Sequence, residues 1–184
     1  IHESCNGSQS LQLKKTLQDM VTLADYARTT LLDNGGEGEL EKQYFGEGDI
    51  AAAIGYYSRI VRGSDKVLFR CDDPDGNCQL TDYYGHWRGD NATDETVICE
   101  KSFQGRRPLE QTCGFGFQLG TDKPSTIWPV DVLHRVMHLP SIVSDRIAHV
   151  ADTYADVLEL ASTHPEFAVS NQLTLQLYAI DSWS

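Results

Sequence analysis

The 184-residue sequence lacks any apolar run that approaches the length of a transmembrane helix, and it has few basic side chains. Fifteen Lys and Arg stand against 27 Asp and Glu, giving a formal net charge of −12 and a pI near 4.7. This charge argues against binding to a nucleic-acid backbone and against insertion into or docking on anionic membranes. It favours cations, although diffusely.

The chain also lacks an initiator Met and begins at Ile1, which predicts that a signal or pro-segment has been removed. Its length and 40% hydrophobic content suit one globular domain, residues 1–184, with a substantial core. The sequence leaves the oligomeric state open.

Cysteine usage and glycosylation sequons point to an oxidising compartment. Two N-x-S/T sequons, at Asn6 and Asn91, predict N-linked glycans in loop sequence. In a secreted chain, cysteines spaced as they are here suggest disulfides rather than a thiolate metal site. We therefore expect a protein that is secreted, either extracellular or in a cell wall. The five cysteines are Cys5, Cys71, Cys78, Cys99 and Cys113.

Sequence alone does not determine disulfide connectivity. Our expectation is Cys71–Cys78 across a turn, together with Cys99–Cys113, which leaves Cys5 unpaired. The odd count means either a free thiol or a partner outside this sequence.

Apolar periodicity predicts a predominantly helical α+β chain. Residues 9–33 have helical spacing and end at a glycine pair, a loop around a short helix occupies 35–48, and Asp49 is a suitable N-cap for a helix over 51–63. The apolar stripes of these helices are assigned to the core. The helical part therefore covers about 9–63.

The middle of the chain, about 64–122, predicts a small antiparallel sheet. Its strand candidates are 67–69, 80–87 and 95–103, which are rich in aromatic and β-branched residues. The turn 71–78 carries three aspartates. Because the spacing of a calcium loop is absent, we interpret it as a solvated acidic turn closed by Pro and Gly.

Metal-ligand candidates concentrate in the last third, where helices are expected over about 126–180. His134 and His138 are four residues apart before Pro140, so they share one face of the first of these helices. His149 and Asp152 are three apart on an expected second helix over 142–163. Imidazole and carboxylate are zinc ligands, and this clustering within nineteen positions predicts a Zn²⁺ site.

A lone H-x-x-x-H pair arises by chance fairly often in a chain with six histidines. The repeated ligand pair, and the placement of the histidines on polar flanks, favour metal binding over chance. His86, beside Trp87, is either a buried strand histidine or a further ligand or proton carrier near this site.

Arg135 occupies the position at which H-E-x-x-H peptidases carry the Glu that takes a proton from metal-bound water. A guanidinium stays protonated, so it cannot serve as general base. It is also repelled by a dication, so we expect Arg135 to point away from the metal and pair with a carboxylate.

HRVMHLP (134–140) and HVADTYADV (149–157) resemble the signature of the fungal HRxxH putative-peptidase family, and CDDPDGNC (71–78) and HWRGDNATDETVIC (86–99) are similar to its middle region. The resemblance implies a zincin-like fold related to the aspzincin peptidases, and a metal set of His134, His138, His149 and Asp152. An aspzincin-like third ligand would be Asp152, whereas the family's own motif includes His149. Members are secreted fungal antigens and allergens thought to act as zinc scavengers (zincophores), and some engage cell-surface or host proteins. The sequence departs from one antigen of this family in one respect: it ends at Ser184 without that antigen's Cys- and His-rich tail.

Two functions of different class follow. The first is a non-catalytic, zinc-binding extracellular protein. The second is an active metallopeptidase whose base comes from elsewhere, with Asp131, Glu159 or His86 as sources. A purely adhesive antigen with a vestigial metal site is a third possibility.

Overall fold

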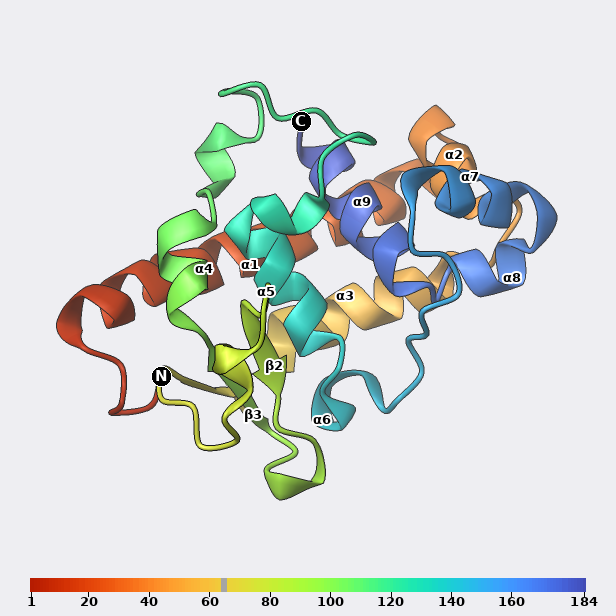
Figure 1. Cartoon of the computed structure of the whole chain (residues 1–184). Helices are drawn as coiled ribbons and strands as arrows, with labels where there is room; N and C mark the ends of the chain where they lie inside the picture. The colour runs from red at the N-terminus through yellow and green to blue at the C-terminus, as the bar shows by residue number, and fades with distance from the viewer. Residues whose placement is uncertain (64–65) are drawn as a thin grey trace.

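The protein is described by a computed structural model that covers residues 1–63 and 66–184 (Figure 1). Helices dominate, and a small sheet lies beside them, which confirms the predominantly helical α+β expectation. A continuous apolar core is shared by helices from both ends of the chain. The helices are α1 (Gly7–Asn34), α2 (Glu39–Phe45), α3 (Ala51–Gly63), α4 (Glu100–Gly105), α5 (Trp128–Val136), α6 (Pro140–Val143), α7 (Tyr154–Thr163), α8 (Pro165–Ala168) and α9 (Gln172–Trp183).

α1 is the long helix that runs behind the others in Figure 1. The Asn6 side chain accepts from the Gln9 backbone N–H, and the Gln9 side chain accepts from the Asn6 N–H, so a capping box begins the helix. Gly35 ends it in the left-handed conformation, with φ of 60°. The expected helix over 9–33 is confirmed, with one extra half-turn at the start.

The other two expected N-terminal elements are also present. α2 is the short helix inside 35–48, and α3 spans the expected residues, with the Asp49 Oδ1 accepting from the Ala51 N–H at 3.0 Å. The expected apolar stripes are buried, including Leu13, Met20 and Tyr57.

The sheet consists of β1 (Leu68–Arg70), β2 (Gly85–Trp87) and β3 (Glu95–Ile98), in the order β1-β3-β2. β2 pairs antiparallel with β3, but β1 pairs with β3 in parallel. The expectation of an antiparallel sheet was therefore wrong for the pair of β1 and β3. In the sheet β3 is the central strand, and in the sequence β2 belongs to the connection between β1 and β3. The strands fall within the predicted sheet region of about 64–122, whose first two positions lie outside the described residues.

The strands are shorter than expected. The candidate 80–87 is extended only at its end, and the candidate 95–103 gives way after Ile98 to α4. The Cys99 N–H still donates to the Tyr84 carbonyl at 3.0 Å, so the ladder ends at Cys99.

The expected disulfide pairing was wrong. The bridges are Cys5–Cys71 and Cys78–Cys99, and Cys113 is an exposed free thiol. The His2 N–H donates to the Phe69 carbonyl at 2.8 Å, which brings the N-terminal segment beside the end of β1 and places Cys5 next to Cys71. Tertiary placement, which sequence spacing does not report, decides the partners.

The expected helix over 142–163 is interrupted. α6 ends at Val143; the next residue, Ser144, has φ of 57°, and Asp145 follows with φ of 54°. Two left-handed residues in succession cannot begin a right-handed helix, so the chain continues as a loop until Thr153 caps α7. The final apolar segment, expected as a helix or extended element over 171–180, is helix α9. No helix in the described ranges is both long and apolar enough to span a bilayer.

Candidate metal centre

α5 is the buried helix from which the site is built. It lies near the middle of the molecule, packed against α1 and α9 (Figure 1), and most of its side chains are buried. Pro140 prevents the helix from continuing, and its last turn tightens as the His138 N–H donates to the Arg135 carbonyl at 3.2 Å. His138 therefore lies just beyond the helix end, although it still faces His134 as the i, i+4 spacing predicts.

The two imidazoles meet at their outer nitrogens. The Nε2 atoms of His134 and His138 lie 2.9 Å apart. Burial, with a smaller contribution from the neighbouring His138, lowers the pKa of His134 to about 4. Burial also lowers the pKa of His138, with His149 adding to the effect. Both rings are consequently neutral near pH 7, which is the form that offers a lone pair to a metal.

His149 completes a group that we call the histidine triad: His134, His138 and His149. One ring nitrogen of each lies within 4.8 Å of the others, and the His138 and His149 rings stack with centroids 5.1 Å apart. His149 reaches this position from the loop between α6 and α7, not from a helix. The expectation that His149 and Asp152 share a helical face was wrong, but His149 converges on the other two.

Asn171, just before α9, holds this loop in place. Its buried Oδ1 accepts from the N–H groups of Val150 and Ala151, at 2.8 and 3.0 Å, and its Nδ2 donates to the Ala151 carbonyl at 3.1 Å. A short parallel bridge joins Ala148 to Asn171. Sequence reasoning missed this positioning residue, because an Asn before a helix signals an ordinary N-cap.

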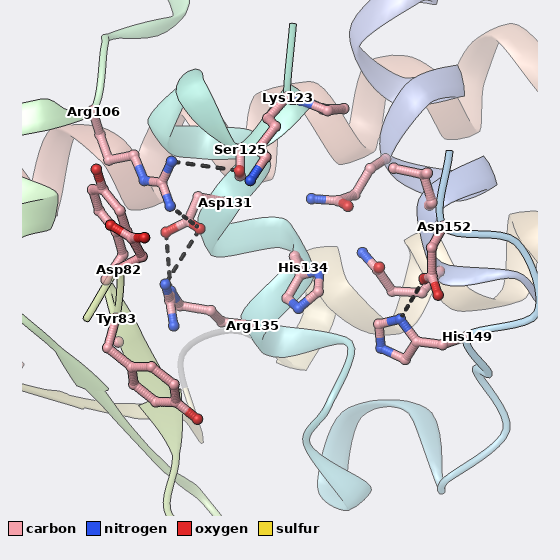
Figure 2. A pocket seen from close by; sticks show the side chains of 16 residues that line it. Asp82, Tyr83, Arg106, Lys123, Ser125, Asp131, His134, Arg135, His149 and Asp152 are labelled. Atoms are coloured by element: carbon pink, nitrogen blue, oxygen red, sulfur yellow. Dashed lines mark hydrogen bonds and ion pairs between the residues drawn. The ribbon is translucent and has the colours of Figure 1, made fainter. Parts of the chain in front are cut away.

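Asp152 lies beside His149 (Figure 2), and its carboxylate is not one of the three ligand atoms that converge. Its Oδ1 is 3.4 Å from the His149 Nδ1, and its side chain is 74% exposed. A carboxylate on the outer nitrogen of a histidine is the usual partner that orients a metal-ligating ring. In this geometry Asp152 supports His149, and it is exposed enough to turn toward a metal.

Arg135 points away from the triad, as expected. It donates to both oxygens of Asp131, from Nε at 3.0 Å and from Nη2 at 3.3 Å (Figure 2). Arg106 donates to the same carboxylate at 3.1 Å and lies over the Tyr84 ring. Asp131 is thus a buried carboxylate held between two guanidinium groups.

The three candidate bases differ in availability. Asp131 has both oxygens occupied, and Glu159 lies on the exposed side of α7. His86 is buried on β2, and its Nε2 lies 3.1 Å from the Asp75 Oδ2. It lines a small cavity together with His134 and His138, so both descriptions of His86 hold in part: it is a packed strand histidine, and it is near the site.

A cleft of about 420 Å³ opens beside the triad. His134, His149 and Asp152 line one side of it, and the Arg106–Asp131–Arg135 cluster lines the other (Figure 2). The cleft is large enough for part of a peptide or a small ligand.

Similarity to known proteins shows the family of this chain. Residues 1–184 match the family described as HRXXH, a putative peptidase family. The chain belongs to this family. It is 45% identical to Antigen 1 of Emericella nidulans and 41% identical to the pH-regulated antigen PRA1 of Candida albicans, in both cases over its whole length. It spans 67% of the former protein and 62% of the latter.

The fold is that of a zinc peptidase from Grifola frondosa. The two structures share a TM-score of 0.71 over 98% of this chain and 99% of the other, at 13% sequence identity. This confirms the expected zincin-like fold.

The residues of the HRXXH chain fit a zinc ion. Three imidazoles converge with one ring nitrogen of each within 4.8 Å of the others, and imidazole nitrogens are ligands that zinc accepts. A carboxylate lies against the third ring, and the Arg135 guanidinium is paired with Asp131.

Proposed function

We propose that this protein binds zinc through His134, His138 and His149, with Asp152 orienting His149 or joining the ligand set. The observation that carries the proposal is the convergence of three imidazole rings from two separate elements. Without a metal, 2.9 Å between two neutral ring nitrogens permits at most one hydrogen bond. A shared cation accounts for the arrangement better than three histidines packed by chance.

We further propose that the protein does not cleave peptides. Zinc bound at such a site would acidify a water molecule, and hydrolysis would then require a carboxylate to take the proton. Arg135 stands at that position in the sequence, and the buried carboxylate nearest to it, Asp131, is held by two arginines. On this proposal, the protein binds zinc through its three histidines, and the described residues place no free carboxylate at the position next to His134.

We also propose that the protein is secreted, either extracellular or in the cell wall, and that it scavenges zinc or serves as a surface antigen. Two disulfides and the family's antigens support this proposal. Asn6 and Asn91 are both exposed, and the helix cap uses the amide oxygen of Asn6, which leaves its nitrogen available for a glycan. Cell-surface or host proteins are further partners that we propose for this family member.

Zinc stoichiometry on metal-stripped protein tests the first proposal. Elemental analysis and calorimetry should give one zinc per chain, and His134→Ala or His138→Ala should remove it while circular dichroism stays unchanged. His164→Ala is the matched control, because His164 is exposed at the start of α8. Equal stoichiometry in all four proteins would contradict the proposal.

A peptidase assay tests the second. Wild type should show no cleavage, and Arg135→Gln should behave alike because it also supplies no base. Arg135→Glu places a carboxylate beside Asp131, so we would pair it with Asp131→Asn to avoid like-charge repulsion. Zinc-dependent cleavage by wild type would overturn the proposal, whereas cleavage restricted to the Glu variants would support it.

The second function is an active metallopeptidase, which the fold match and the open cleft favour. Its base would have to be a carboxylate with free oxygens near the triad, and Asp152 is the one beside it. Asp152→Asn separates the two functions. It should abolish cleavage in a peptidase, while a zinc-binding protein without activity would show only weaker affinity.

A further inference from the structure

A second group of metal-ligand atoms lies in the sheet region, separate from the histidine triad. Cys78, His86 and Cys99 each place one ligand atom within 4.8 Å of the other two. We call these residues the cysteine–histidine cluster. The two sulfur atoms are joined as a disulfide in the oxidised protein, so they do not act as thiolate ligands in that state.

The His86 ring has the surroundings of a metal-ligating histidine. It is 8% exposed, and its Nε2 lies 3.1 Å from the Asp75 Oδ2. Its Nδ1 is buried, with no hydrogen-bond partner in the described part of the chain. A buried polar atom without a partner is costly, and a ligating histidine typically bonds its outer nitrogen to a carboxylate. Asp75 therefore sets the tautomer that leaves the Nδ1 lone pair free.

Hydrogen bonds hold the acidic turn that carries Cys78, in addition to the disulfide. The Asp73 oxygens accept from the N–H groups of Asn77 and Cys78, at 3.1 and 2.8 Å. Arg88 donates to both oxygens of Asp75, which lowers the Asp75 pKa to about 2. These aspartates are structural, so the turn is not simply solvated as its sequence suggested.

The other two members are fixed by the sheet. His86 pairs with Val97 across β2 and β3, and the Cys99 N–H donates to the Tyr84 carbonyl. Each ligand position is thus determined by backbone or carboxylate hydrogen bonds. Opening the sulfur–sulfur bond would leave the three side chains close together.

We propose that reduction of Cys78–Cys99 creates a zinc site made of two thiolates and His86. The disulfide takes up two electrons and two protons from a dithiol reductant, which becomes a disulfide itself, and two thiols result. A zinc ion then displaces both thiol protons and accepts the lone pair of His86. Two cysteines and one histidine form a known zinc ligand set with a fourth position open to water. Re-forming the disulfide by exchange with a disulfide oxidant, which takes up two electrons and two protons to become a dithiol, removes both thiolates and releases the ion. This site does not depend on the function proposed for the histidine triad.

Cobalt, which reports thiolate ligation by a near-ultraviolet charge-transfer band, tests the proposal on the full chain. The protein is reduced with dithiothreitol, desalted without oxygen, and titrated with Co²⁺ and then Zn²⁺. Reduction should add one metal ion per chain together with the band, and Zn²⁺ should bleach it. The oxidised protein should show no such band.

Variants assign the band to these residues. Cys78→Ser with Cys99→Ser should abolish it, whereas Cys5→Ser with Cys71→Ser, and Cys113→Ser, should retain it. Asp75→Asn should lower the affinity about 10- to 100-fold, because it loses the carboxylate that orients His86. No additional metal on reduction of wild type would overturn the proposal, as would an undiminished band in the Cys78→Ser, Cys99→Ser protein. If reduced wild type shows no cobalt band but still binds zinc at the histidine triad, only the present proposal is overturned. The function proposed for the triad is then unaffected.

Discussion

The histidine triad and the cysteine–histidine cluster each bring three ligand atoms within 4.8 Å of one another, but these atoms are in different chemical states. In the triad, the three rings come from the end of α5 and from a loop, and burial keeps the rings of His134 and His138 neutral near pH 7. In the cluster, the atoms are equally close, but a covalent bond occupies two of them. Proximity alone therefore does not make a metal site; the state of each donor atom decides.

The two regions are also held together differently. Hydrogen bonds from Asn171 hold the loop of the triad, whereas two disulfides and an ion-pair network of Arg70, Arg88, Asp72, Asp75 and Glu95 hold the sheet region. We expect the triad to be sensitive to single side chains and the sheet region to redox conditions.

The largest effect should come from the triad itself. His134→Ala with His138→Ala removes two of three rings, and zinc affinity should fall by more than about 100-fold, because each ligand supplies a large share of the binding energy. Calorimetry on oxidised protein measures this. The Cys78→Ser, Cys99→Ser protein serves as control and should keep its zinc at the triad; a parallel loss there would mean that the regions are not independent.

The disulfides should differ in their contribution to stability. They close loops with sequence separations of 66 and 21 residues, for which chain entropy predicts about 4 and about 3 kcal/mol. Replacing Cys5 and Cys71 by Ser should therefore destabilise the protein more than replacing Cys78 and Cys99. Denaturant unfolding of both variants measures the difference. The reverse order would show that the ion-pair network contributes less to the stability of the sheet region than we infer.

Asn171→Ala should loosen the loop of the triad without touching a ligand. It leaves the partly buried N–H of Val150 and the buried N–H and carbonyl of Ala151 without their partner, which costs about 1–3 kcal/mol of stability. Zinc affinity should fall about 10-fold as His149 loses its fixed position. Asn171→Asp keeps the acceptor for the two N–H groups and should retain more of both; identical behaviour of the two variants would argue against this role.

A separate prediction concerns the stability of the metal-free protein at low pH. The folded pKa of His134 is about 4 against about 6.5 in the unfolded chain, because burial penalises its charged form. Between these values the unfolded chain binds the extra proton, so stability is present above pH 6.5 and declines as the pH falls toward 4. The decline attributable to His134 is at most about 3 kcal/mol.

Unfolding by denaturant between pH 7 and 4, in the presence of a chelator, measures this slope. His134→Gln should flatten it, while His164→Gln, which changes an exposed ring, should not. A slope unaffected by His134→Gln would assign the acid sensitivity to other groups.

Much of the fold could be predicted from the sequence because local signals and packing agree there. Apolar spacing, Gly35 and Asp49 gave α1 and α3 nearly to the residue, since capping and periodicity act within a few positions. The same spacing over Ile147, Val150 and Ala151 was misleading. Ser144 and Asp145 turn the chain there, and Val150 is 50% exposed.

The site divides in the same way. His134 and His138 are recognisable because four residues of a helix bring them together. His149 was predicted as a ligand on the assumption of a helix, and it arrives through a loop fixed by Asn171, twenty-two positions along the chain. Disulfide partners and the parallel strand pair likewise depend on contacts between distant segments, and no local pattern encodes them.

Asn171 has a consequence for the history of this protein. The Asn171 side chain links the position of His149 to the start of the last helix. A mutation at one of these two positions therefore changes how much the other contributes to zinc binding. Natural selection should therefore act on positions 149 and 171 together. Lineages that abandon the third histidine should drift at 171, and lineages that keep it should keep an amide there.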